Sequence, residues 1–119
     1  MLTSLLPSPV RGEIWRVDLE PVRGHEQGRT RPALVVSNDI VNHGPGGLVT
    51  VVPITTKAKP IRSFLKIEPP EGGLPQMSFI ICDQVRTISK QRLTKRYGAV
   101  SPEVLLEVER RLTFLLDLK

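Results

Sequence analysis

The stretch Leu48-Val49-Thr50-Val51-Val52-Pro53-Ile54-Thr55-Thr56 is the most β-prone part of the chain. Most of its residues branch at Cβ, and such side chains favour the extended backbone of a sheet. Pro53 has no N–H to donate to a neighbouring strand. Its position predicts that this strand lies at the edge of a sheet or is bulged there.

Shorter apolar runs on either side predict the strands that would pair with it. Ala33–Val36 is continuously apolar, which is typical of a strand buried on both faces. Glycine- and proline-rich loops at 44–47 and 69–75 separate the runs. Asn38 can cap a short helical turn, and a second turn is expected at 89–92. The expected strands span residues 13–19, 33–37, 48–56, 64–67, 78–82, 84–88 and a short final piece around 97–100.

A single long helix is expected at the C-terminus. Ser101-Pro102-Glu103 combines a hydroxyl N-cap, a proline at the first helical position and an acid in the first turn. Several short strands followed by one helix predict a small α+β domain built on a strongly bent antiparallel sheet or partly open barrel. We expect residues 1–10 to be a flexible arm and residues 11–119 to be one domain. The apolar stripe of the helix would be Leu105, Val108, Leu112 and Leu115, widened by Val104 and Leu116.

The charge of the chain favours a polyanionic partner. The formal net charge is +5 and the pI is near 9.9. Residues 1–100 carry 14 Lys/Arg against 8 Asp/Glu, whereas residues 101–119 carry 3 against 4. The basic excess therefore lies in the body of the domain, where it can release counterions from a nucleic acid.

The cysteine, histidine and apolar content argues against disulfide-bonded, zinc-binding, secreted and membrane-spanning proteins. The only cysteine, Cys82, lies in an apolar run and predicts a buried structural thiol in a reducing compartment. With two histidines and one cysteine, no standard zinc spacing is present, so we expect no metal and no cofactor. Met1–Pro9 lacks the basic start of a signal peptide, and no run reaches the ~20 apolar residues of a membrane span. We therefore expect a cytoplasmic protein without membrane contact.

The loop Gly24–Pro32 is richer in polar chemistry than a turn requires. It places an imidazole, a carboxylate, an amide and two guanidinium groups within nine residues. Cleavage of RNA through the 2′-hydroxyl needs a proton acceptor, a proton donor and cationic donors on the phosphorane oxygens, and these residues could supply them. The alternative is a solvated ion pair between the arginines and Glu26.

A second basic segment spans residues 84–96. It carries five Lys/Arg between 86 and 96, with no acid from Gln84 to Pro102. Such a segment can line a groove for a phosphate backbone. Read alone, it fits a solvated basic face equally well. Aromatic residues are too sparse to predict a stacking platform for bases.

Four separate motifs of this chain resemble the MazF/PemK family of toxin endoribonucleases. They are Arg11–Trp15, Gly24–Pro32, Pro53–Thr56 and Asp83–Ile88, and the resemblance covers residues 11–118. It implies an SH3-like, CcdB/MazF-like barrel with a C-terminal helix, a homodimer, and sequence-specific, metal-independent cleavage of single-stranded RNA. The implied products are a 2′,3′-cyclic phosphate and a 5′-hydroxyl. The resemblance also implies a cognate antitoxin whose C-terminal segment, expected to be acidic, blocks the RNA groove.

The resemblance also implies roles for individual residues. By position, Arg31 and Thr55 are the active-site arginine and threonine, and Arg31 would stabilise the phosphorane. Glu26 is the first candidate for the proton acceptor and His25 the second. The expected RNA-binding residues are Gly24, Gln27, Arg29, Gln84, Arg86, Lys90 and Arg92.

Two other functions are compatible with the same fold. One is a non-catalytic poison, such as a CcdB-like gyrase inhibitor, whose determinants would lie in the C-terminal helix. That helix ends in Leu115-Leu116-Asp117-Leu118-Lys119 and shows no such signature. The other is a module that only binds RNA. The presence of both Arg31 and Thr55 argues against that reading.

Overall fold

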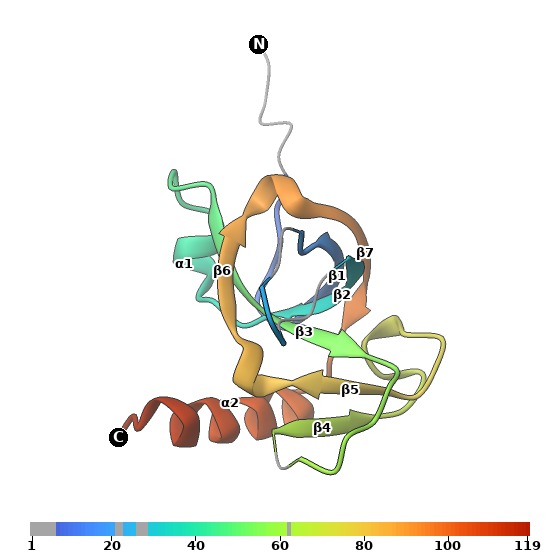
Figure 1. Ribbon diagram of the computed structural model, residues 1–119. Helices are drawn as coiled ribbons and strands as arrows, with labels where there is room; N and C mark the ends of the chain where they lie inside the picture. Colours follow the sequence, from blue (N-terminus) through green and yellow to red (C-terminus); the bar gives the residue numbers. More distant parts are fainter. Residues whose placement is uncertain (1–6, 21–22, 26–28, 62) are drawn as a thin grey trace.

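A computed structural model describes residues 7–20, 23–25, 29–61 and 63–119. Its seven strands form one antiparallel sheet that is strongly bent but not closed, and a long helix follows the last strand (Figure 1). The predicted α+β class is therefore confirmed. The strands are β1 (Glu13–Asp18), β2 (Thr30–Val35), β3 (Leu48–Thr55), β4 (Phe64–Ile67), β5 (Ser78–Ile81), β6 (Arg86–Ser89) and β7 (Leu93–Ala99). The helices are α1 (Asp39–Asn42), α2 (Pro102–Leu116) and three 3₁₀ turns, η1 (Glu71–Gly73), η2 (Cys82–Gln84) and η3 (Lys90–Arg92).

Strand β3 lies inside the sheet, so of the two predictions for Pro53, an edge strand or a bulge, the edge strand is wrong. The strand order is β4-β5-β3-β2-β1-β7, and β6 also pairs with β3. The Thr50 carbonyl accepts the Val36 N–H and the Thr50 N–H donates to Ser37 Oγ, just past the end of β2, so the backbone groups of even-numbered β3 residues point toward the β2 side. By alternation, the Pro53 nitrogen faces the opposite edge. There the pairing with β6 ends at Val51 and the pairing with β5 begins at Ile54, so no hydrogen bond is lost.

Strand β2 separates two apolar cores. Alternate residues Ala33 and Val35 face the first core, while Leu34 and Val36 face the second. This confirms the prediction of a strand buried on both faces. The first core lies inside the bend of the sheet and also contains Val17, Leu19, Val49, Val51, Ile88 and Leu93. The second lies between the sheet and α2 and includes Ile14, Val52, Ile54, Ile80 and Val108.

Helix α2 begins as the sequence predicts, but its apolar stripe is only partly buried. Ser101 Oγ accepts the Val104 N–H at 3.3 Å, and Val108 is fully buried. Leu115 and Leu116, which were expected to pack on the sheet, are 43% and 53% exposed. The C-terminal end of the helix extends past the strands that its first turns cover (Figure 1).

The smaller elements follow local sequence signals. Asn38 caps α1 by accepting the Ile40 N–H at 2.7 Å. The last strand, β7, is longer than expected because it pairs with β1 from Val17 to Glu13. Pro9, in the expected arm, is buried, and its carbonyl lies 2.8 Å from His43 Nε2. Residues 1–6 of the expected arm lie outside the described residues.

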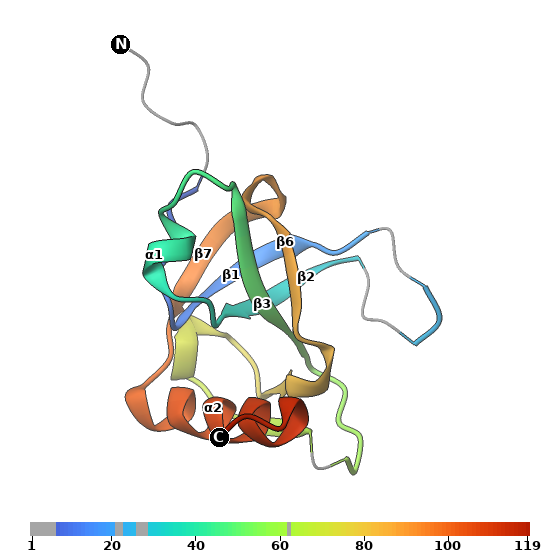
Figure 2. The same cartoon turned by 90° about the vertical axis from the view of Figure 1, so that its left-hand side faces the viewer.

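Strands β1 and β2 extend side by side away from α1, while α2 runs beneath the strands, along the bottom of the view (Figure 2). Within the described residues, no helix is both long and apolar enough to cross a membrane.

Candidate active site

The register of β2 and β3 brings Arg31 and Thr55 opposite one another. Ala33 pairs with Pro53, and Val35 pairs with Val51. Two residues further along each strand, the same register reaches Arg31 and Thr55. Because alternate residues share a face, both side chains lie on the face of the first core, at its open end.

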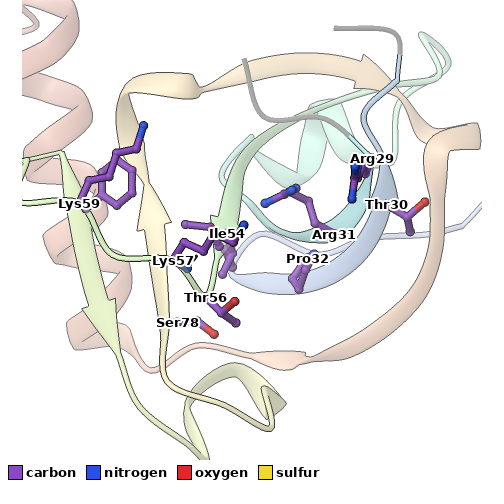
Figure 3. Close-up of a pocket in the computed structure, with 11 residues that line it drawn as sticks. Arg29, Thr30, Arg31, Pro32, Ile54, Thr56, Lys57, Lys59 and Ser78 are labelled. Carbon is purple, nitrogen blue, oxygen red and sulfur yellow. Dashed lines mark hydrogen bonds between the residues drawn. The ribbon is translucent and has the colours of Figure 1, made fainter. Parts of the chain in front are cut away.

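Both residues line a cavity of about 560 Å³ at this end of the sheet. Figure 3 shows Arg29 and Arg31 at the start of β2 on one side, with Lys57 and Lys59 on the connection from β3 to β4 on the other. The complete lining is Arg29, Thr30, Arg31, Pro32, Ile54, Thr55, Thr56, Lys57, Lys59, Phe64 and Ser78.

The charge of the side chains that line the cavity favours binding of an anion. Four of its lining side chains are cationic and none of these residues is acidic. Burial, followed by the neighbouring charge of Arg29, lowers the pKa of the Arg31 guanidinium. An anion placed between these groups would relieve the repulsion between them, and a guanidinium matches two phosphate oxygens at once.

Thr55 is positioned to donate a hydrogen bond into the cavity. The residue is buried, and its Oγ1 accepts the backbone N–H of Lys57 at 3.2 Å. A hydroxyl that accepts at its oxygen keeps its own proton for a second partner. Thr55 can therefore donate to a phosphate oxygen while its Oγ1 still accepts the Lys57 N–H.

Arg29 reaches the cavity through an unusual backbone conformation. Its φ is +62°, in the left-handed region that side chains other than glycine rarely adopt. Two contacts hold it there: its N–H donates to the Glu20 carboxylate, and its carbonyl accepts the Leu19 N–H at 2.9 Å. The start of β2 is thus tied to the end of β1.

A second cavity, of about 380 Å³, lies beside η2 and the start of β6. It is lined by His25, Asp83, Gln84, Val85 and Arg86. Gln84 Nε2 donates to the His25 carbonyl at 3.3 Å, so the predicted basic segment and the β1–β2 loop meet here. The structure therefore brings His25, Gln84 and Arg86 together, but none of them lines the first cavity.

The remaining predicted site residues have different positions. Gly24 lies on the β1–β2 loop with a φ of +56°, whereas Glu26 and Gln27 fall outside the described residues. Arg92 donates to backbone carbonyls at the end of β1. Lys90 is only 6% exposed and its Nζ lies 3.5 Å from the carbonyl of Gly44, which precedes the start of β3, whereas the cavity lies at the end of β3. The expected contact of Lys90 with RNA stays a prediction.

Lys57, Lys59, Phe64 and Ser78 line the cavity but were not predicted as site residues. The first two lie in a polar turn that directly follows Thr55. Their positions two and four residues after the catalytic candidate Thr55 were the available signal, but such a turn is also an ordinary strand connection. Phe64 and Ser78 become neighbours of the site because β5 pairs with both β3 and β4.

Cys82 is buried, as predicted, and burial raises the pKa of its thiol to about 11. Among the described residues, no three His, Cys, Asp or Glu side chains gather as a metal site would require. The polar side chains that line the first cavity carry guanidinium, ammonium and hydroxyl groups.

Comparison with known protein families gives one consistent result. Residues 10–116 match the family described as PemK-like, MazF-like toxin of type II toxin–antitoxin system. Endoribonuclease MazF9 of Mycobacterium tuberculosis is 38% identical over 113 residues, covering 91% of this chain and 96% of that protein. Endoribonuclease EndoA of Bacillus subtilis is 35% identical over 109 residues, covering 91% and 94%.

Solved structures show the same similarity. MazF from Deinococcus radiodurans superimposes with a TM-score of 0.83 at 28% identity, covering 93% of this chain and 98% of that one. A mycobacterial endoribonuclease, solved in complex with its cognate antitoxin, gives a TM-score of 0.76 at 26% identity, covering 93% and 97%.

Proposed function

As the chain belongs to the PemK-like, MazF-like toxins of type II toxin–antitoxin systems, we propose that it is an endoribonuclease that cleaves single-stranded RNA at short sequences and so arrests growth. Its curated relatives, 32–38% identical over most of the chain, are endoribonucleases. The observation that carries the proposal is the pair Arg31 and Thr55, opposite one another in a cavity lined by basic and not by acidic side chains.

The reaction proposed is an internal transfer. The 2′-oxygen of the RNA attacks the adjacent phosphorus, its proton passes to a base, and the bond from phosphorus to the 5′-oxygen breaks. The products are a 2′,3′-cyclic phosphate and a 5′-hydroxyl. No protein nucleophile takes part, so the site has only to hold the phosphate and move protons.

Arg31 and Thr55 are proposed to act on the phosphorane. The guanidinium would balance the charge that develops on the phosphorane oxygens, and the Thr55 hydroxyl would donate to one of them. Burial and the charge of Arg29 lower the pKa of Arg31, which makes it a better proton donor to the leaving 5′-oxygen. For the base, Glu26 is proposed first and His25 second; both belong to the β1–β2 loop.

We propose that the reaction needs neither metal nor cofactor. The predicted result is full RNA cleavage in an excess of chelator, because the proposed charge stabilisation comes from Arg31 and its basic neighbours. Loss of cleavage in chelator, with recovery on adding a divalent cation, would contradict this.

The partner proposed is an antitoxin with an acidic C-terminal segment. Solved relatives include a mycobacterial endoribonuclease with its cognate antitoxin and a MazE–MazF pair from Deinococcus radiodurans. An acidic segment would complement the four cations around the cavity and exclude RNA from it. The proposed location of both partners is the cytoplasm.

A homodimer is proposed as the assembly. Phe114, Leu115, Leu116 and Leu118 are 43–76% exposed near the end of the chain. An apolar surface of this kind favours association with a second copy. Sedimentation should give a dimer for the wild-type protein and a shift towards monomer for Phe114→Glu; a wild-type monomer at micromolar concentration would contradict the proposal.

The central test replaces Arg31. Purified wild-type protein, Arg31→Ala and the control Lys66→Ala are incubated with a long single-stranded RNA, and the new 5′ ends are mapped. Lys66 is an exposed cation on β4 outside the cavity. Arg31→Ala should fold normally and cleave at least ~1,000-fold more slowly, since it removes the central charge.

The outcomes separate the candidate functions. Cleavage at defined sites by wild-type and Lys66→Ala, and not by Arg31→Ala, supports the endoribonuclease. RNA binding without cleavage would favour the binding module, and growth arrest without either would favour a non-catalytic poison. Full activity of Arg31→Ala would show that the assigned site is wrong.

A further inference from the structure

Arg92 does not line the cavity, but it contacts backbone that in turn contacts Arg29, a lining residue. We infer that Arg92, assisted by Arg86, is a positioning residue of the proposed ribonuclease: it holds the backbone of residues 18–20, and through them it holds Arg29 at the cavity. We call residues 18–20 the stem segment, because they lead from β1 into the β1–β2 loop. The inference rests on the proposed function for its effect on activity, but not for its structural part.

Two arginines donate to three consecutive carbonyls of the stem segment. Arg92 Nη1 donates to the Asp18 carbonyl at 3.0 Å and also to the Glu20 carbonyl. Arg86 Nη1 donates to the Leu19 carbonyl at 3.4 Å. Alternate carbonyls of an extended chain point to opposite edges, so the two guanidinium groups hold the stem segment from both edges.

The stem segment in turn fixes the backbone of Arg29. The Leu19 N–H donates to the Arg29 carbonyl at 2.9 Å, and the Glu20 carboxylate accepts the Arg29 N–H. Both contacts support the left-handed conformation at φ +62°. Left unsupported, that conformation is unfavourable for arginine.

Electrostatics gives a reason why such support is needed. Arg29 and Arg31 repel one another, as the effect of Arg29 on the Arg31 pKa shows. Without a bound anion, this repulsion favours a conformation with Arg29 turned away from the cavity. Contacts that keep Arg29 in place before RNA binds lower the cost of ordering the site during the reaction.

If Arg92 and Arg86 instead bind RNA directly, as the sequence predicts, their replacement should have a different effect from the loss of a positioning residue. A cation that contacts a phosphate should contribute to the salt dependence of RNA cleavage. In the structure, both guanidinium groups instead contact carbonyls of the chain itself. The two roles can therefore be separated by experiment.

The test compares Arg92→Ala, Arg92→Lys and the control Arg16→Ala. Arg16 is an exposed arginine on β1 that donates to the Thr94 side chain and not to the stem segment. The first readout is amide hydrogen exchange at Leu19 and Arg29 in the protein without RNA, measured by NMR. Arg92→Ala should speed exchange at both amides by about 10-fold, while Arg16→Ala should leave them unchanged.

The second readout is kcat/KM for RNA cleavage across a range of salt concentrations. Arg92→Ala should lower kcat/KM by about 10- to 100-fold, the range expected for losing hydrogen bonds from a charged donor. The salt dependence should match that of Arg16→Ala. Arg92→Lys keeps the charge but loses the planar fork, and should recover only part of the activity.

Three results would overturn the inference: unchanged exchange at Leu19 and Arg29 in Arg92→Ala, wild-type activity in that variant, or complete rescue by Arg92→Lys. A salt slope reduced by about 0.7 relative to the control would instead show a direct phosphate contact. If the wild-type protein cleaves no RNA, the proposed function fails. The exchange measurement still decides whether Arg92 holds the stem segment and Arg29.

Discussion

Thr55→Val tests the proposed catalysis with the smallest change in shape. The substitution replaces a hydroxyl with a methyl group at a side chain that is 8% exposed and lines the cavity. It removes the proposed donor to the phosphorane, together with the acceptor for the Lys57 N–H. The positive charges of the cavity are all retained.

The size of each effect follows from these contacts. Loss of one donor to a developing oxyanion costs roughly 2.7–4 kcal/mol, or about 100- to 1,000-fold in kcat. Loss of the hydrogen bond from Lys57 costs about 0.5–1.5 kcal/mol in stability, and the exposure of Lys57 to water favours the lower value. For a chain of this length the Tm should fall by only about 2–6 °C.

The assay is single-turnover cleavage of a labelled single-stranded RNA at 25 °C, with thermal unfolding measured on the same samples. Thr55→Ser is the matched control, because it keeps the hydroxyl and should retain cleavage within about 10-fold of wild type. A kcat for Thr55→Val within a factor of three of wild type would refute the role of the hydroxyl. A large loss in both variants would show that the methyl group is needed as well as the hydroxyl.

Three further predictions concern stability and reactivity. Hydrogen bonds to the Glu13 carboxylate outweigh its burial and lower its pKa, so they stabilise the fold above the ordinary glutamate pKa. Urea titrations should show wild type losing this contribution, about 1–2 kcal/mol, as pH falls below ~4, and Glu13→Gln lacking it throughout. In the same titrations Gly73→Ala should lower the free energy of unfolding by more than ~2 kcal/mol, because φ is +75° and the new Cβ would lie 2.3 Å from the Tyr97 carbonyl oxygen. The control Gly46→Ala places its Cβ where nothing lies within 4 Å, and its stability should be nearly unchanged. A thiol reagent at pH 8 should leave Cys82 unmodified in the folded protein, since burial raises its pKa to about 11; rapid labelling without unfolding would contradict this.

Local patterns were sufficient for most secondary-structure elements. The N-cap at Ser101, the cap at Asn38 and the continuously apolar run at 33–36 each depend on neighbouring residues only, and the structure agrees with all three. Of the two positions predicted for Pro53, at a sheet edge or at a bulge, the edge is wrong because β3 lies inside the sheet. Whether a proline interrupts a sheet depends on which strands lie beside it, and β3 changes its partner at that residue.

The apolar stripe of α2 shows the same limit. Periodicity predicts which side of a helix is apolar, but not how far the sheet extends beneath it. Leu115 therefore has the spacing of a core residue and is nevertheless exposed.

The sequence by itself determined the chemistry available to this protein: a basic domain without a metal-binding spacing, one loop crowded with ionisable groups, and motifs of one toxin family. Only the tertiary structure decided how that chemistry is distributed. The register of β2 and β3 sets Arg31 opposite Thr55, the β3–β4 connection adds Lys57 and Lys59, and Arg92 turns to backbone carbonyls. The physical reason is that local propensities act between neighbours in sequence. Distances between segments tens of residues apart depend on strand register and on the bend of the whole sheet.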